Sequence, residues 1–294
     1  MAALVTAVIP CFNHGRFVAE CVASLEAQTV ADWRAIVLDD ASTDGETPAL
    51  CDAVASDRVR VVHLPKNHGR ALVRNVGIGL AETEAVLSLD ADDALEPTHF
   101  ERTVPLLLSD PRLGIVYTDY RYFGSEQGIM RGRPFSRQTL YVAQYIYAGS
   151  LFRRSAWAQT AGYRAEFSEG NEDYDFFLSL VEAGFDGAWV PEPLYRYRKH
   201  AGQWSAQRAV ALADQILTTR QRLRAFHHEG LAARGLLEAF DHVTWSKDAE
   251  ARIAAGEPRA ARASLRRAAR ARPFSTTNAV LFFRALAASN KRES

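Results

Sequence analysis

The sequence predicts an α/β fold, in which a mostly parallel, twisted sheet is flanked by helices and followed by a helical extension. Over the first 200 residues, short apolar segments alternate with segments of helical periodicity. That alternation is typical of a doubly wound parallel sheet. After about residue 205, Ala and Arg dominate and strand patterns disappear. We therefore expect two domains, residues 1–205 and residues 206–294.

Composition narrows the class of protein. Of the 294 residues 48% are hydrophobic, enough for a substantial core, and Lys+Arg and Asp+Glu both number 35. Because basic and acidic residues are equal in number, the protein has no net positive charge that would attract nucleic acid. No apolar run approaches the length of a membrane span, the N-terminus lacks a signal pattern, and three cysteines form no framework. We expect a cytoplasmic protein that touches a membrane, if at all, on its inner face.

The first half of the chain carries the clearest elements. Apolar residues recur at helical spacing between the strand-like segments. The segment at 85–89 is a continuous apolar run, typical of a strand buried on both faces. We expect strands at residues 4–9, 33–38, 59–64 and 85–89, with helices at residues 16–27 and 71–81.

Two of these strands end in acids. Asp39-Asp40 follows one, and Asp90-Ala91-Asp92-Asp93 follows another. Ligands of open α/β sheets bind beyond the carboxyl ends of the strands, so these carboxylates should meet in one crevice. Oxygen ligands on a short loop suit Mg²⁺ or Mn²⁺. The alternative is a solvated acidic turn that opens a helix, and for Asp40 and Asp44 capping is the simpler interpretation.

The middle of the chain is less regular. Residues 97–108 have a helical pattern and residues 114–122 alternate like a strand. Residues 123–138 hold three Gly, one Pro and three Arg, and we expect a mobile loop near the site, because loops often carry selectivity. Residues 145–154 are predicted as a strand. Its aromatic residues could stack on a ligand or pack in the core.

An acidic segment opens the next predicted helix. Phe176, Phe177, Leu180 and Val181 form its apolar face, which stops near Gly184. The acids before that face therefore lie in the first turn, where the helix dipole favours carboxylates. Capping is one interpretation of these acids. The other is a general base directed into the crevice.

In this order the motifs resemble those of family 2 glycosyltransferases of the GT-A type, which bind a nucleotide-diphospho-sugar. The resemblance covers about residues 4 to 205. Its motifs are residues 5–10 with Phe12-Asn13, Ser24-Leu25 with Gln28-Thr29, residues 37–44, Asn67-His68-Gly69, Arg74-Asn75 with Gly77, Asp90-Ala91-Asp92-Asp93, Glu172-Asp173 and residues 195–200.

The resemblance implies a metal-dependent, inverting hexosyltransferase. It would move a sugar from a UDP- or dTDP-linked donor to a hydroxyl of a glycan or lipid-linked acceptor, in bacterial polysaccharide, glycolipid or cell-surface glycan synthesis. For the donor nucleotide, it implies that Asp39 accepts the imide N–H of the base and Asp90 holds the ribose. The other donor-side residues it implies are Pro10, Phe12 and Asn13 at the base, and Arg70 at the phosphates, although Arg70 could equally be a solvated helix residue.

The same resemblance assigns the reaction. Asp173 would be the general base, with Asp175 a weaker alternative, and Glu172 would hold a hydroxyl. Gly149 would let the acceptor sugar approach the backbone closely. Asp92 would ligate a divalent cation, Mn²⁺ or Mg²⁺, and His200 would either complete its shell or have a structural role. Gln203-Trp204-Ser205 would begin a loop closing over the diphosphate.

Two rival functions remain. Nucleotidyl transfer would favour a glycine-rich basic loop after the first strand, but residues 11–16 are poor in Gly. The other rival is a sugar-nucleotide-binding or scaffolding protein without transfer activity, and the intact acids at 90, 92 and 173 argue against such a dead site. Beyond residue 205 we expect helices and a basic cluster that is either a solvated face or a contact to anionic lipid or a phosphate-bearing acceptor. The helices are expected at residues 210–226, 231–253, 258–271 and 276–288, and the cluster is Arg259, Arg262, Arg266, Arg267, Arg270 and Arg272.

Overall fold

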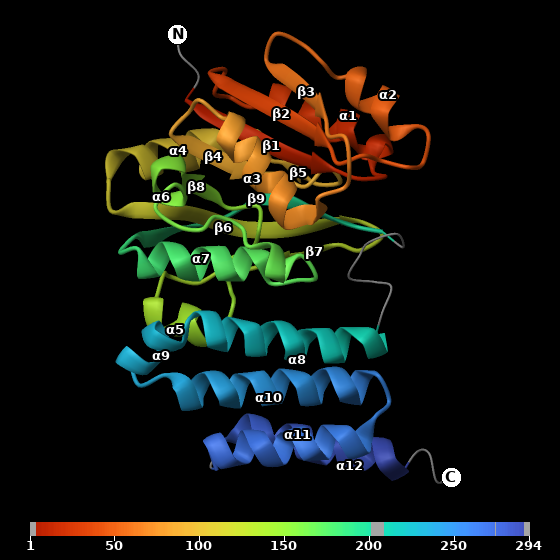
Figure 1. Ribbon diagram of the computed structural model, residues 1–294, viewed down its shortest axis with the longest axis vertical. Helices are drawn as coiled ribbons and strands as arrows, with labels where there is room; N and C mark the ends of the chain where they lie inside the picture. The colour runs from red at the N-terminus through yellow and green to blue at the C-terminus, as the bar shows by residue number, and fades with distance from the viewer. Residues whose placement is uncertain (1–3, 201–208, 274, 291–294) are drawn as a thin grey trace. The chain divides into compact units, whose positions relative to one another are not determined.

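The computed structural model describes residues 4–200, 209–273 and 275–290, which belong to two compact units (Figure 1). The predicted boundary at 205 and the predicted loop at Gln203-Trp204-Ser205 lie outside the described residues. The first unit comprises Met1–Arg137, Tyr145–Ser168 and Glu172–His200, and the second comprises Gln138–Gln144, Glu169–Asn171 and Ala201–Ser294.

The first unit is built on one sheet, to which nine strands of the described chain belong, in the order β3-β2-β1-β4-β8-β6-β9-β5 with β7 paired to β6. The four N-terminal strands are parallel neighbours, as predicted. β8 lies between β4 and β6 and runs antiparallel to both. It therefore connects the N-terminal parallel strands to the long parallel pair β6–β9. The strands are β1 (Val5–Cys11), β2 (Trp33–Asp39), β3 (Val59–His63), β4 (Ala85–Ser88), β5 (Ala94–Leu95), β6 (Leu113–Gly124), β7 (Gly128–Met130), β8 (Leu151–Arg153) and β9 (Asp186–Lys199).

Helices cover both faces of this sheet. Successive side chains of β1 point to opposite faces, so this strand packs against helices on both sides. Ala7 and Ile9 belong to a buried core shared with residues of α1 and α4. Val8 points to the other face, where α3 approaches so closely that a Cβ on Gly77 would lie 2.3 Å from Val8 Cγ1. The helices of this unit are α1 (Gly15–Glu26), α2 (Thr47–Asp52), α3 (Gly69–Leu80), α4 (His99–Ser109), α6 (Arg154–Trp157), the 3₁₀ helix η1 (Ala165–Phe167) and α7 (Glu172–Glu182). Helix α5 (Arg137–Val142) begins with Arg137 of the first unit, but its other residues belong to the second unit.

The predicted loop at residues 123–138 contains a strand, β7, which pairs with β6. The hairpin is secured beyond its end, because the Gly132 amide donates to Asp119 Oδ1 at 2.7 Å. Trp189 Nε1 donates to the same oxygen at 2.9 Å. The segment is therefore partly regular where the Gly and Pro content suggested an irregular loop.

The predicted strand at residues 145–154 is much shorter, since only β8 is a strand there. The chain turns before it, where Ser150 Oγ donates to the Tyr147 carbonyl at 2.7 Å. The ring of Tyr147 lies 4.9 Å from that of Tyr120 and 5.0 Å from that of Tyr195. Core packing is therefore the observed use of Tyr147.

The second unit is helical, and within it α10 packs against α8, α11 and α12. The helix predicted over residues 231–253 is divided at Gly235, where φ is +65°. The Leu236 amide donates to the Leu231 carbonyl and the Gly235 amide to the Ala232 carbonyl, a Schellman cap that ends a helix. None of the helices in the described segments is long and apolar enough to cross a bilayer. The helices are α8 (Ala209–Phe226), α9 (His228–Ala233), α10 (Leu237–Ala254), α11 (Pro258–Ala271) and α12 (Thr276–Asn290).

Candidate active site

Asp39 ends β2 and is almost fully buried. Its Oδ1 accepts the Ser42 amide at 3.0 Å, and its Oδ2 lies 2.9 Å from His63 Nδ1. Burial raises the pKa of Asp39, but the hydrogen bonds from Ser42 and His63 outweigh burial and hold that pKa below its usual value. The ring of His63 also lies 2.9 Å, through Nε2, from Asp52 Oδ1. Asp39 is therefore an oriented, ionised acceptor.

The loop after β1 lies next to the loop after β2. Asn13 Oδ1 accepts the Thr43 amide at 2.8 Å, and the Asn13 amide donates to Ser42 Oγ at 3.0 Å. Asn13 and Ala41 both have left-handed φ values, +56° and +57°, which are uncommon for residues with a side chain. The ring of Phe12 is 43% exposed beside them. Asn13 thus joins the loops, and Phe12 offers a free aromatic face, while Pro10 is partly buried at the end of β1.

Arg74 of α3 connects two acids from distant parts of the chain. Its Nη2 lies 2.7 Å from Asp90 Oδ1 and its Nη1 lies 2.6 Å from Glu172 Oε1. Its Nε donates to Ser88 Oγ at 2.9 Å. Burial alone would raise the pKa of Asp90, but the charge of Arg74 keeps that pKa below its usual value. The end of β4 and the first turn of α7 are therefore joined through one cation.

Asp173 lies beside Glu172 in the same first turn and stays partly exposed. Burial and the charge of Glu172 together raise the pKa of Asp173 to about 7. Arg70 Nη1 lies 3.2 Å from Glu172 Oε1, so Glu172 is held by two arginines. Asp175 is fully buried and paired with Arg164 at 2.7 Å. Asp173 has the pKa expected of a general base near neutral pH.

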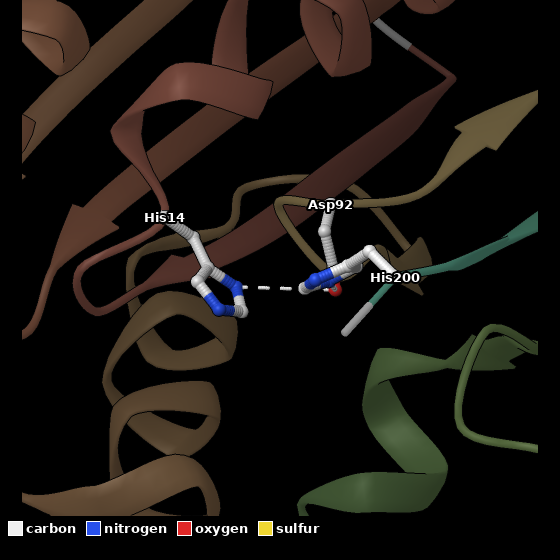
Figure 2. A group of neighbouring side chains, drawn as sticks. All are labelled: His14, Asp92 and His200. Atoms are coloured by element: carbon white, nitrogen blue, oxygen red, sulfur yellow. Dashed lines mark hydrogen bonds and ion pairs between the residues drawn. The ribbon is translucent and has the colours of Figure 1, made fainter. Parts of the chain in front are cut away.

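A mixed nitrogen and oxygen donor set surrounds Asp92. Figure 2 shows His14, Asp92 and His200 together, from the loop after β1, the loop after β4 and the end of β9. Asp92 Oδ2 lies 3.0 Å from His200 Nε2 and 3.9 Å from His14 Nδ1. The three residues offer ligand atoms within 4.8 Å of one another. Imidazole and carboxylate ligands at this spacing fit a divalent cation such as Mn²⁺.

Asp90 and Asp93 form a second acidic group with Asp92, but other contacts occupy both of them. Asp93 is buried, and it accepts the Tyr195 hydroxyl at 2.6 Å and the Arg198 amide at 2.8 Å. Asp90 is paired with Arg74 as described. Asp92 is therefore the carboxylate best able to ligate a cation.

Gly149 has a packing reason to be glycine. A Cβ at this position would lie 2.1 Å from Tyr195 Cε2. The missing side chain makes room for the Tyr195 ring, whose hydroxyl holds Asp93. A direct contact of Gly149 with an acceptor stays a prediction.

The family model described as Glycosyl transferase family 2 matches residues 6–169, more than half of the chain. This chain belongs to glycosyl transferase family 2.

Curated relatives of this family 2 chain include synthases of bacterial glycans. Chondroitin synthase of Pasteurella multocida is 32% identical over 186 residues, which cover 62% of this chain and 19% of the relative. The O-antigen biosynthesis protein RfbC of Myxococcus xanthus is 30% identical over 240 residues, covering 79% of this chain and 18% of the relative. The chain thus spans about a fifth of the length of these relatives.

Solved structures of glycosyltransferases share the fold, which confirms the predicted GT-A architecture. The mannosyltransferase PcManGT from Pyrobaculum calidifontis, in complex with GDP-Man and Mn²⁺, has a TM-score of 0.63 at 18% identity, covering 98% of this chain and 80% of that one. TarS 1-349 of S. aureus, in complex with UDP-GlcNAc, has a TM-score of 0.58 at 16% identity, covering 89% and 88%.

Within this family 2 domain, the predicted residues from β1, β2, β4 and α7 all belong to the first unit. The sequence pattern did not predict that His14, His63 and the ion pairs of Arg74 belong to the candidate site. His14 follows Asn13 in a loop that was itself predicted to bind the donor, so its position was available as a signal. His63 ends an ordinary strand, and nothing in the sequence around it signals its two acidic partners.

Proposed function

We propose that the first unit is a metal-dependent, inverting glycosyltransferase. It moves a hexose from a UDP- or dTDP-linked donor to a hydroxyl of a glycan or lipid-linked acceptor. We place the reaction in bacterial polysaccharide, glycolipid or surface glycan synthesis, on the cytoplasmic side. The names of the relatives and the nucleotide-sugars bound in the solved structures support this proposal.

One observation carries the proposal. Asp173, with a pKa of about 7, adjoins Glu172, and Glu172 is joined through Arg74 to Asp90 at the strand end. A group of this pKa is half ionised near neutral pH, where a general base works best. Its link to Asp90 brings it to the crevice in which the nucleotide is proposed to bind.

Each residue of the proposed site has its own role in binding or transfer. Asp39 accepts the imide N–H of the base, with Phe12 against the ring, and Asp90 accepts the ribose hydroxyls. The acceptor hydroxyl gives its proton to Asp173 as its oxygen bonds the anomeric carbon and the bond from that carbon to the diphosphate oxygen breaks. Attack opposite the leaving nucleoside diphosphate inverts the anomeric centre. Arg70, the second arginine beside Glu172, is assigned to the phosphates.

Asp92, with His200 and His14, would hold the cation. When bound, a divalent cation supplies positive charge that offsets the charge of the diphosphate, worth several kcal/mol in such enzymes. General base catalysis by Asp173 adds roughly 10²–10⁴-fold.

The decisive experiment uses the full chain, Mn²⁺, a panel of UDP- and dTDP-hexoses and oligosaccharide acceptors. A thermal-shift screen selects the donor, since a ligand that binds the folded state raises apparent stability. We then expect nucleoside diphosphate release with a glycoside of inverted configuration, read by nuclear magnetic resonance.

Asp173→Asn should keep donor binding and lose transfer. Glu182→Gln, an exposed carboxylate at the other end of α7, is the matched control and should transfer normally. Pyrophosphate release from a nucleoside triphosphate would indicate nucleotidyl transfer instead. Donor binding without transfer to any acceptor would indicate a binding protein.

A further inference from the structure

The last two helices carry an excess of positive charge that the rest of the chain balances. Residues 258–290 hold seven arginines and no acidic residue, although the whole chain has 35 basic and 35 acidic residues. The acids that balance these arginines therefore lie elsewhere. A segment of this kind attracts an anionic surface or a polyanion.

On α11 the arginines lie on the side away from the core. Leu265 and Ala268 are buried, whereas Arg259, Arg266 and Arg270 are exposed. The spacing of the three arginines, seven and four residues, places them on one helical face. In the described part of this helix none of the three is ion-paired with an acid. The pairs of the neighbouring helices involve other arginines. Their charge is available to a partner.

On α12 large apolar side chains lie in water. Leu281 and Ala285 pack into a small core with residues of α10 and α11. Val280 and Phe283 are 59% and 69% exposed, and Phe282 is 42% exposed. Apolar side chains gathered in this way on a surface usually mark a contact site.

We propose that two neighbouring helices of the second unit bind an anionic membrane together, α11 through its exposed arginines and α12 through its exposed apolar side chains. Arg259, Arg266 and Arg270 contact lipid phosphates, and Val280 and Phe283 enter the boundary between headgroups and acyl chains. This is how interfacial amphipathic helices bind.

The combination of exposed arginines with exposed apolar side chains favours a lipid surface as the partner. Arginines alone would fit any polyanion, including a soluble phosphate-bearing glycan. Phe283 and Val280 gain nothing from such a polyanion, because it offers no apolar phase in which to leave water. A lipid surface offers both the phosphates and, just beneath them, hydrocarbon.

The test is co-sedimentation of the full chain with vesicles of phosphatidylcholine alone, or mixed with phosphatidylglycerol, at low and high salt. We expect binding to the mixed vesicles only, weakened by salt. The double variant Arg266→Glu/Arg270→Glu should bind at least about tenfold more weakly. Phe283→Ser should lose about tenfold, since it removes one buried apolar side chain.

The matched control is Arg60→Glu/Arg112→Glu, which changes net charge equally at two exposed positions of the first unit. It should bind vesicles like the unaltered chain, and thermal melting checks that all variants fold. Equal losses in both double variants would overturn the proposal, since only net charge would matter. Three other outcomes would also overturn it: no binding to mixed vesicles, binding to soluble polyphosphate without vesicle binding, or a dimer abolished by Phe283→Ser without vesicle binding.

Discussion

Arg74 and Glu172 are 98 positions apart in the chain, yet Arg74 Nη1 lies 2.6 Å from Glu172 Oε1. Both side chains are only 3% exposed. The same guanidinium pairs with Asp90 at 2.7 Å. One buried cation therefore sets the spacing between the end of β4 and the first turn of α7, and so between the proposed donor and acceptor sides.

Arg74→Gln should destabilise the first unit. Asp90 would lose its pair with Arg74, and Glu172 would keep only the more exposed Arg70. Breaking a buried ion pair from one side costs about 3–5 kcal/mol. Urea unfolding at neutral pH measures the loss. Arg102→Gln is the control, because its pair with Glu192 is largely exposed and such pairs contribute about 1 kcal/mol or less. Similar losses in the two variants would show that the Arg74 network does not hold the fold together.

Asp173 should set the pH dependence of transfer. Only its ionised form accepts a proton, so kcat/KM should rise with pH and level off above about 7, the raised pKa of this carboxyl. Asp173→Asn should lower transfer by roughly 10²–10⁴-fold. Initial rates across the acid and neutral range, with nucleotide titrations beside them, check both expectations.

Glu172→Gln tests one of the two causes of that pKa, the other and larger one being burial. The charge of Glu172 raises the pKa of Asp173, so removing it should move the rise in kcat/KM to lower pH. Glu182→Gln should leave the profile in place. A profile that does not move in Glu172→Gln would show that the charge of Glu172 does not set the pKa that governs transfer.

Local pattern was sufficient for much of the fold. The apolar runs of β1, β2 and β4 mark strands buried on both faces, and the acids that follow β2 and β4 mark the predicted crevice. The division between α9 and α10 was missed because helical periodicity continues through Gly235, where a backbone cap ends the helix.

Residues of the candidate site could be proposed from the sequence where they adjoin a strand end or a helix start. It was not predictable where contacts depend on strand order. β1 lies between β2 and β4, and this order brings the loops that carry His14 and Asp92 together. Arg74 reaches Glu172 only because α3 and α7 meet across the fold. No spacing within the sequence encodes such contacts.

His14 should act as a third metal ligand. Asp92→Ala should abolish binding of Mn²⁺ with nucleotide, and His200→Ala and His14→Ala should each weaken it. Because imidazole suits Mn²⁺ better than Mg²⁺, the histidine variants should lose more affinity for Mn²⁺. Calorimetric titration with each metal and UDP measures this. His68→Ala, a histidine beside Asp40 instead, is the control. Unchanged Mn²⁺ affinity in His14→Ala would remove it from the shell.

His63 is the remaining neighbour of the proposed base pocket. Its two ring nitrogens each lie 2.9 Å from a carboxylate oxygen, one of Asp39 and one of Asp52. The hydrogen bonds that the His63 ring donates to both carboxylates raise the pKa of His63. The charged ring can donate to both acids at once, so it fixes the plane of Asp39.

His63→Leu should therefore weaken recognition of the base and leave the contacts with the ribose and phosphates unchanged. Binding of UDP should fall about tenfold, the worth of one charge-assisted hydrogen bond. Binding of UDP methylated at N3 should not change, because that base has no imide hydrogen to give to Asp39. His63→Gln restores a donor and should recover part of the discrimination, while Asp52→Ala keeps the Asp39 contact and should behave nearly as the unaltered chain. Competition titrations with both nucleotides give the ratio. Equal losses for the two nucleotides would mean that His63 supports the fold rather than the orientation of Asp39.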